Sequence, residues 1–156
     1  MPNYELDAID RRILIELQED GRVTNHEVSE RVGLSPSPCL RRIRQLEQQN
    51  VIQRYVALID PAALGLTVSA FVRVRLSVQD DRHLFQFEEA ITLFPEVMEC
   101  YIMSGEADYQ LRVLVSSLGA FEDFLRYKLT KISGVSQVTS SFALRPIVYR
   151  TAVPID

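Results

Sequence analysis

Residues 24–50, TNHEVSERVGLSPSPCLRRIRQLEQQN, predict two short helices joined by a tight turn. Thr24 can cap the first helix, and Glu27 three residues later completes a capping box. Gly33 is expected to end that helix, because glycine adopts the left-handed conformation that a helix end requires. Two consecutive Ser-Pro pairs over residues 35–38 then offer two starts for the second helix, since serine caps a helix and proline tolerates its first position.

The second helix, which we expect from Ser37 onward, has an apolar face and a polar face. Its apolar side carries Leu40, Ile43 and Leu46, with Cys39 and Glu47 at the edges. Its polar side carries Ser37, Arg41, Gln45 and Gln48, with Arg42 and Arg44 at the margins. Arginine and glutamine make paired hydrogen bonds to guanine and adenine edges in the major groove of DNA. The pattern therefore favours a helix-turn-helix whose second helix contacts DNA over a merely solvated amphipathic helix.

The residues that we expect to contact DNA lie at the starts of both helices and along the polar face. They are Thr24, Asn25, Ser35, Ser37, Pro38, Arg41, Arg42, Arg44, Gln45 and Gln48. Arg41 is central on the polar face and is assigned to base recognition. Arg42 and Arg44 flank it and are expected to bind phosphates on the groove walls.

The composition is that of a folded protein: of 156 residues, 47% are hydrophobic and 24% are charged. No apolar run reaches the roughly 18 residues that a membrane helix needs, and the acidic start MPNYELDAID has no apolar signal region. We therefore expect a cytoplasmic protein with no membrane association. Cys39 and Cys100 form no metal-like cluster, so neither a metal nor a cofactor is expected.

The net charge of −4 argues against a general polyanion-binding protein. Positive charge is local, because residues 37–50 contain three arginines against one glutamate, a net charge of +2. A weakly charged monomer would hold DNA poorly, since non-specific affinity comes from phosphate neutralisation. We infer that binding to double-stranded DNA needs at least a dimer, which places two such helices on one duplex.

Elements on either side of the opening stretch complete a first domain over residues 1–60. A helix is expected over residues 8–19, capped by Asp7 and packed against the other two helices through an apolar stripe. Residues 51–60, VIQRYVALID, are rich in β-branched and aromatic residues and predict a strand, as a wing or a connecting strand. Proline and glycine in residues 61–66 then predict a linker.

Residues 67–156 predict a second domain of four strands and two helices. Strands are expected over residues 68–76, 97–104, 109–115 and 135–144, and helices over residues 82–94 and 118–132. The order βαββαβ is that of a ferredoxin-like domain, an antiparallel sheet with both helices on one face. The predicted fold class is therefore α+β, a winged helix-turn-helix followed by a ferredoxin-like effector-binding and oligomerisation domain.

Apolar residues occur on both sides of the predicted strands, for example throughout residues 97–103. The sheet face without helices therefore needs a cover. The simplest cover is the same sheet from a second subunit, which predicts a two-fold homodimer.

Four segments together resemble the Lrp/AsnC (leucine-responsive and asparagine-regulator) family of bacterial and archaeal transcription factors. They are LDAIDRRILIELQEDGRVTNHEVSERVGLSPSPCLRRIRQLEQQNVI, ALIDP, PEVMECYIMSGEADYQLRV and GVSQVTSSF, which cover nearly the whole chain. The resemblance implies an N-terminal winged helix-turn-helix and a C-terminal domain that senses amino acids. It also implies dimers that often assemble into octamers, with small effectors bound between dimers.

The resemblance centres an effector site on residues 105–108. A turn containing glycine exposes N–H groups that can bind an α-carboxylate, and Asp108 or Glu106 can bind an α-ammonium group. The expected site comprises Tyr101, Met103, Gly105, Glu106, Asp108, Thr139, Ser141 and Phe142. Met103 and Phe142 favour an apolar amino acid such as leucine or methionine. Taken alone, these residues also fit an ordinary turn and a sheet core.

Two other functions fit parts of the sequence. Small enzymes also use ferredoxin-like domains, with His83 or Tyr101 as the catalytic group. However, the chain has only two histidines and no Ser/His/Asp, metal or phosphate-loop pattern, so we expect no enzymatic activity. An architectural protein that compacts DNA without an effector is the other alternative.

Overall fold

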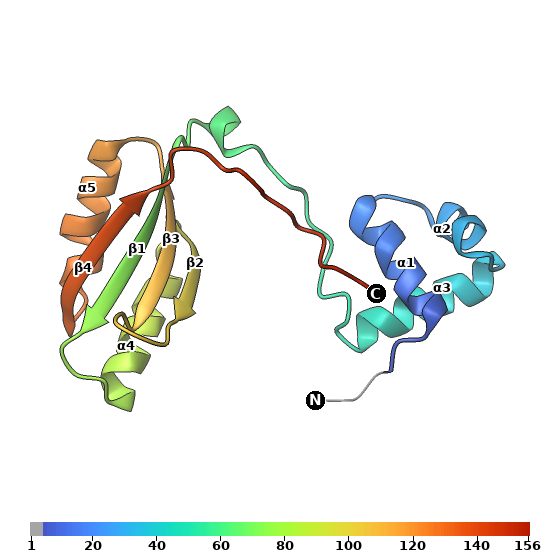
Figure 1. Cartoon of the computed structure of the whole chain (residues 1–156), viewed down its shortest axis with the longest axis horizontal. Helices are drawn as coiled ribbons and strands as arrows, with labels where there is room; N and C mark the ends of the chain where they lie inside the picture. The colour runs from blue at the N-terminus through green and yellow to red at the C-terminus, as the bar shows by residue number, and fades with distance from the viewer. Residues whose placement is uncertain (1–4) are drawn as a thin grey trace. The chain divides into compact units, whose positions relative to one another are not determined.

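Three helices form the N-terminal part of the chain, in the expected order (Figure 1). The computed structural model describes residues 5–156. The helices are α1 (Ala8–Glu19), α2 (Asn25–Val32) and α3 (Pro36–Gln48). Asp7 and Thr24 cap α1 and α2 through capping boxes, and Gly33 ends α2 with a φ of 75°. The predicted helix-turn-helix is therefore confirmed.

Helix α3 begins one residue earlier than expected, at Pro36. Ser35 is its N-cap residue, although the Ser35 hydroxyl accepts no capping hydrogen bond, and Pro36 occupies the first helical turn. Pro38 also lies in that turn, where backbone N–H groups have no helical partner, so its missing N–H removes no helical hydrogen bond. The first of the two Ser-Pro pairs therefore starts the helix.

The core of the helical unit is apolar and includes Cys39. Its buried residues are Ile13, Leu14, Val28, Val32, Cys39, Ile43 and Leu46. Leu40 is predicted in the apolar stripe and Cys39 at its edge, but Cys39 is fully buried and Leu40 is 36% exposed. Spacing gives the reason: Ile43 and Leu46 lie four and seven residues after Cys39, on one side of the helix, whereas Leu40 is turned away by about 100°.

Residues 51–60 do not form the predicted strand. Within residues 5–156 this segment pairs with no strand of the sheet, and Tyr55, Val56 and Leu58 are exposed. A strand needs a neighbouring strand for its backbone hydrogen bonds, and a single chain supplies none here. The chain continues into the short 3-10 helix η1 (Pro61–Leu64), which Asp60 caps.

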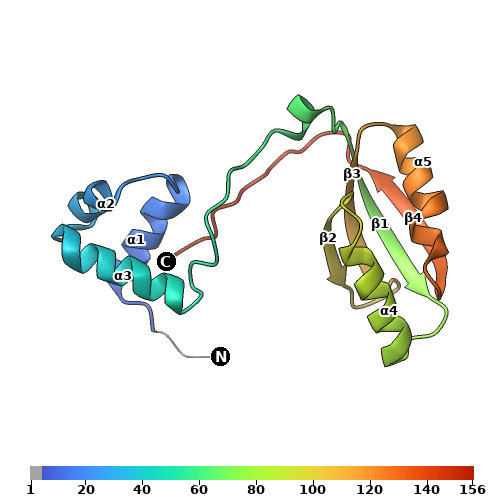
Figure 2. The same ribbon diagram turned by 180° about the vertical axis from the view of Figure 1, so that it is seen from behind.

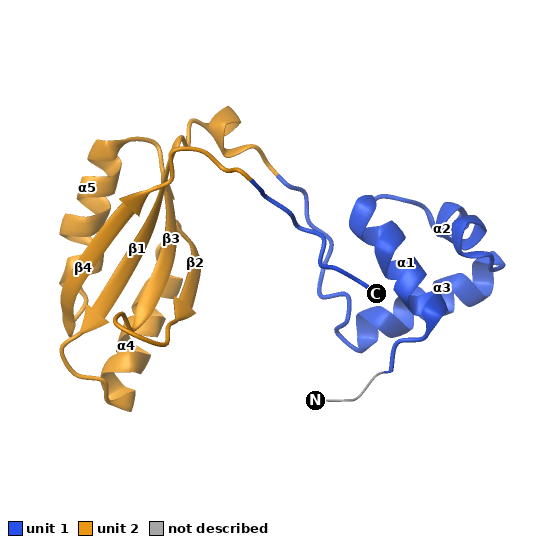
Figure 3. Cartoon of the chain, in the orientation of Figure 1, with its two compact units in different colours: residues 1–58, 148–156 blue, residues 59–147 orange. Residues whose placement is uncertain are grey.

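The C-terminal segment Val148–Asp156 belongs to the helical unit, as Figure 3 shows. The Gln18 side chain on α1 donates to the Val153 carbonyl at 3.1 Å and accepts from the Val153 amide at 2.7 Å. Ile155 packs against the helical core. The second compact unit is Ile59–Ile147. The predicted second domain, residues 67–156, wrongly includes this C-terminal segment. Hydrogen bonds between the Gln18 side chain and the Val153 backbone leave no periodic pattern in the sequence from which the contact could be predicted.

The second unit is an antiparallel sheet in the order β2-β3-β1-β4. Its strands are β1 (Val68–Leu76), β2 (Val97–Ile102), β3 (Tyr109–Val115) and β4 (Val135–Phe142). Helices α4 (Asp81–Thr92) and α5 (Leu118–Tyr127) cover one face of the sheet, and Figure 2 shows the molecule from the side opposite to that of Figure 1. The predicted second helix ends early, because the 3-10 helix η2 (Leu129–Lys131) follows α5. The order of elements and the one-sided helices confirm the predicted α+β fold.

Alternate residues of the central strands build the core between the sheet and its helices. Ala70, Val72 and Val74 of β1 are fully buried in one cluster with Phe87 of α4 and Phe124 of α5. Because side chains alternate along a strand, the residues of β1 between these three point to the other face of the sheet, which no helix covers and which is called the bare face below.

The bare face of the sheet is more polar than expected. Its positions on β1, β3 and β4 are Phe71, Arg73, Arg75, Gln110, Arg112, Leu114, Gln137, Thr139 and Ser141. A register shift in β2 between Val97 and Glu99 also breaks the predicted alternation. Val97 pairs with Val113 on the helix side, whereas Tyr101 pairs with Gln110 on the bare side. Such a bulge reverses the sides that the following side chains face.

Candidate DNA-binding and effector sites

The polar face of α3 brings the predicted base-contacting residues together in an open groove. The groove, of about 600 Å³, is lined by Ser37, Leu40, Arg41, Arg44, Gln45, Gln48 and Gln49. Arg41 and Arg44 are exposed and form no ion pair with any residue in 5–156. Leu40 and Gln49 are additional to the prediction, and Leu40 joins this face because Cys39 occupies the core.

Arg42 lies apart from this groove and contacts the start of α1. Its Nη1 atom is 2.7 Å from Asp7 Oδ2 and 2.8 Å from Asp10 Oδ1. The Asp10 residue is buried. The backbone N–H of Asp10, followed by the Arg42 guanidinium, lowers the pKa of Asp7. Arg42 thus forms an ion pair inside the protein, and its predicted phosphate contact stays a prediction.

The remaining predicted DNA contacts lie at the starts of α2 and α3. The Thr24 hydroxyl donates to Glu27 at 2.6 Å within the capping box, and the Asn25 side chain donates to the Pro36 carbonyl at 2.9 Å. Asn25 therefore ties α2 to α3. Ser35 is exposed, and Pro38 is half-buried. Contacts from these residues to DNA stay predictions.

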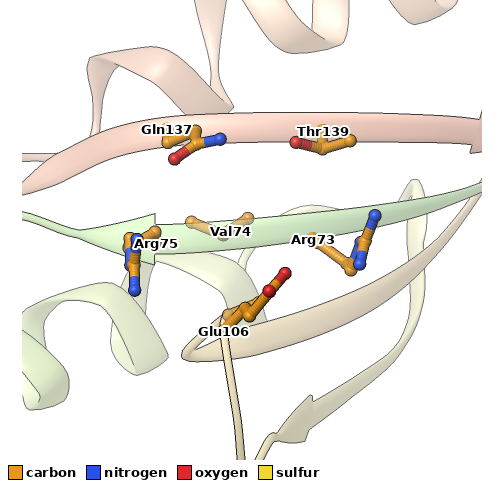
Figure 4. A pocket seen from close by; sticks show the side chains of 7 residues that line it. Arg73, Val74, Arg75, Glu106, Gln137 and Thr139 are labelled. Carbon is orange, nitrogen blue, oxygen red and sulfur yellow. The ribbon is translucent and has the colours of Figure 1, made fainter.

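A hollow of about 420 Å³ lies beside the turn between β2 and β3 (Figure 4). It is lined by Arg73, Val74, Arg75, Glu106, Ala107, Gln137 and Thr139. Glu106 reaches back from the turn toward β1, between the two arginines (Figure 4). Glu106 and Thr139 belong to the predicted site, whereas Arg73, Arg75 and Gln137 are additional. The side of the sheet on which Arg73 and Arg75 lie could be predicted from the sequence, because both alternate with the apolar residues of β1.

The charges in this hollow complement a zwitterion. Among residues 5–156, neither Arg73, Arg75 nor Glu106 has an ion-pair partner within 4.0 Å. An arginine can bind a carboxylate through two parallel hydrogen bonds, and a carboxylate can bind an ammonium group. Thr139 lies opposite Arg73, and Gln137 lies opposite Arg75, across the pairing of β1 with β4. They add neutral hydrogen-bonding groups to the same hollow.

Gly105 and Asp108 shape the turn rather than line the hollow. Gly105 has a φ of 117°, which favours glycine. The Asp108 carboxylate accepts from the Leu76 amide at 2.7 Å and from the Gln79 side chain at 2.6 Å. The Asp108 amide donates to the Val74 carbonyl at 3.0 Å. Asp108 therefore fastens the turn to the end of β1, and Glu106 is the carboxylate that faces the hollow.

The other predicted effector-site residues are dispersed around the sheet. Tyr101 and Met103 are exposed, on the edge strand β2 and just after it. Ser141 pairs with Phe71 on the bare face. Phe142 lies on the opposite face and contacts Phe121 of α5, with ring centroids 5.0 Å apart. The predicted apolar wall from Phe142 is therefore corrected, because one step along β4 places its ring in the helix layer.

His83, the histidine considered as a possible catalytic group, contacts the residue that caps α4. His83 Nδ1 lies 2.6 Å from Asp80 Oδ1, and Asp80 also caps α4. In the described part of the chain, no group of three or more His, Cys, Asp and Glu side chains is placed to hold a metal ion. None of the helices within residues 5–156 is long and apolar enough to cross a membrane.

Two family models match the chain, one for each unit. A model described as winged helix-turn-helix DNA-binding matches residues 6–53. A model described as Lrp/AsnC ligand binding domain matches residues 69–153. The first match contains helices α1 to α3, and the second contains the four strands, apart from Val68 at the start of β1, together with the hollow.

Proteins of similar length match the chain almost from end to end. The Bkd operon transcriptional regulator of Pseudomonas aeruginosa is 45% identical over 97% of this chain and 99% of its own length. The leucine-responsive regulatory protein of Escherichia coli K12 is 40% identical over 94% of this chain and 89% of its own. A solved transcriptional regulator from Neisseria meningitidis, in complex with L-Met, is 40% identical with a TM-score of 0.93, and the match covers 97% and 98% of the two chains.

These relatives are transcriptional regulators, not enzymes. The chain therefore has a helix-turn-helix unit for DNA and a ligand-binding unit, and it belongs to the Lrp/AsnC family of transcriptional regulators.

Proposed function

We propose that the protein recognises specific DNA sequences through α3, acts in the cytoplasm, and responds to an amino acid bound in the second unit. The groove on α3 supports the first part, because Arg41, Gln45 and Gln48 lie together and exposed. These side chains suit guanine and adenine edges, and Arg44 suits a phosphate.

One observation carries the effector part of the proposal: Arg73, Arg75 and Glu106 line a single hollow without ion-pair partners among residues 5–156. An arginine would bind the α-carboxylate of the effector, and Glu106 would bind its α-ammonium group. Met103 precedes the same turn and stays exposed, so it is available to an apolar side chain of the effector. The relative solved in complex with L-Met supports an amino acid as the ligand class.

A thermal-shift screen of the twenty amino acids tests this proposal. A ligand that binds only the folded protein stabilises it by about 2.7 kcal/mol at a concentration 100 times its Kd. At least one amino acid should therefore raise the melting temperature, and its des-amino and decarboxylated analogues should not. If all twenty amino acids leave the melting temperature unchanged at millimolar concentration, the hollow is not an amino-acid site.

We further propose that the bare sheet face forms a two-fold homodimer, and that dimers assemble into octamers. Phe71 and Tyr101 are exposed on this face, beside the Glu99–Arg112 ion pair. A second copy would cover the apolar side chains and place two α3 helices on one duplex. The exposed residues Tyr55, Val56 and Leu58 also offer an unpaired segment to a second chain.

The dimer proposal predicts that residues 66–156 alone stay dimeric or larger in sedimentation at low micromolar concentration. Phe71→Asp should shift that population toward monomer, because it places a charge where the second sheet would pack. Phe85→Asp, on the exposed side of α4, is the matched control. A well-behaved monomer of residues 66–156 would contradict the proposed interface.

A further inference from the structure

Two carboxylates at the start of α1 bind one arginine of the DNA-contacting helix. Asp7 is the N-cap residue of α1, and its side chain accepts from the amides of Ile9 at 2.9 Å and Asp10 at 2.8 Å. The hydrogen bonding is reciprocal, since the Asp10 carboxylate accepts from the Asp7 amide at 3.3 Å. Asp7 and Asp10 thus form a capping box without any contact from α3. Arg42 Nη1 then bridges the two carboxylates, at 2.7 Å and 2.8 Å.

This bridge differs in kind from the apolar packing of α3. Cys39, Ile43 and Leu46 pack α3 through apolar surface, which is non-directional. Charge-assisted hydrogen bonds are short and directional, so the bridge constrains how α3 is rotated about its axis. The Arg42 side chain is 27% exposed, and that of Asp10 is 2% exposed. The Asp10 arm of the bridge is therefore shielded from the solvent that weakens surface ion pairs, whereas the Asp7 side chain is 50% exposed.

Helix α1 holds α2 by the same means. The Arg12 side chain donates to the Arg31 carbonyl at 2.7 Å, and Arg31 forms an ion pair with Glu16 at 2.9 Å. Polar contacts from α1 therefore fix both helices of the helix-turn-helix.

We propose that Arg42 is a positioning residue for DNA recognition: it binds the capping box of α1 and so fixes the rotation at which α3 presents Arg41 to the bases. Arg41 immediately precedes Arg42 in α3, so the two side chains are about 100° apart around the helix axis. A rotation of α3 would move Arg41, Gln45 and Gln48 together, because all three lie on its polar face. Base contacts depend on such geometry, whereas phosphate contacts tolerate small shifts.

The test compares Arg42→Gln, Asp7→Asn and the double variant with Arg44→Gln in the full-length protein. Asp7→Asn removes the carboxylate yet keeps a good N-cap residue, so α1 stays capped. Arg44→Gln is the matched control, because it removes the same charge from the same helix in the DNA groove. An operator is first selected from a random DNA library. Affinities for operator and random duplexes are then measured over a salt series, at a temperature where circular dichroism shows each variant folded.

We expect Arg42→Gln and Asp7→Asn each to lower operator affinity at least about 5-fold more than random-DNA affinity. About 5-fold corresponds to the lower end of the effect of losing one base contact, about 1 kcal/mol. The double variant should bind the operator no worse than Arg42→Gln alone, since Arg42→Gln already removes the contact with Asp7. The salt dependence should stay that of the unaltered protein, whereas Arg44→Gln should flatten it. Equal losses on both DNAs with a flatter salt dependence for Arg42→Gln would overturn the proposal in favour of a phosphate contact. Lower melting temperatures with unchanged affinities would overturn it in favour of a purely structural role.

Discussion

Arg41→Ala is expected to lower affinity for the operator by about 1–3 kcal/mol, roughly 5- to 150-fold, and to relax specificity at one position of each half-site. Arg41 lines the exposed groove on α3 and has no ion-pair partner among residues 5–156. Its removal therefore leaves the fold intact and deletes two hydrogen bonds to one base. The measurement is selection from a random DNA library, followed by titration of single-base operator variants.

Arg44→Ala is the comparison for this result. Arg44 lines the same groove and is assigned to a phosphate. Its substitution should therefore weaken binding to all sequences alike and reduce the salt dependence by about one phosphate contact. The assignment of Arg41 to base recognition fails if Arg41→Ala lowers operator and random-DNA binding equally.

Local sequence rules predicted the helical unit well. The Asp7 cap, the Thr24 capping box and the left-handed Gly33 use interactions within four residues, which sequence spacing shows directly. The ion pairs of Arg42 could not be predicted, because its partners lie more than 30 residues away in the sequence. An arginine at the edge of a polar face gives the same sequence pattern whether it binds a phosphate or a carboxylate. The strand expected over residues 51–60 was wrong for a related reason, since a strand depends on a partner.

The hollow lies beside the glycine turn on which the predicted effector site is centred, but its lining differs from the predicted residues. The glycine turn fixed the place, because Gly105 has a positive φ. Two choices then depended on tertiary geometry. Asp108 and Glu106 were equivalent in sequence, but only Glu106 faces the hollow, since Asp108 binds Leu76 and Gln79. Phe142 fell on the wrong side because neighbouring residues of a strand point to opposite faces.

The placement of Asp108 also determines which variant tests the effector site. Asp108→Ala would remove the hydrogen bonds that fasten the turn to β1, so loss of response in that variant would not identify a ligand contact. Glu106→Gln removes only a charge, at an exposed residue without an ion-pair partner in the described chain. Glu122→Gln, at an exposed position of α5 outside the hollow, is the matched control.

Glu106→Gln is expected to abolish the thermal shift caused by the amino acid and its effect on DNA binding, while single-site DNA affinity stays within about 2-fold of that of the unaltered protein. The hollow belongs to Ile59–Ile147 and α3 to the other unit, so the ligand acts on DNA binding indirectly. If it acts by favouring one assembly, DNA carrying several half-sites should respond more strongly than a short duplex with one site. Mobility-shift titrations on both lengths, with and without the amino acid, measure this for Glu106→Gln and Glu122→Gln. A Glu106→Gln protein with full response would exclude the hollow as the effector site, and equal responses on both DNA lengths would exclude coupling through assembly.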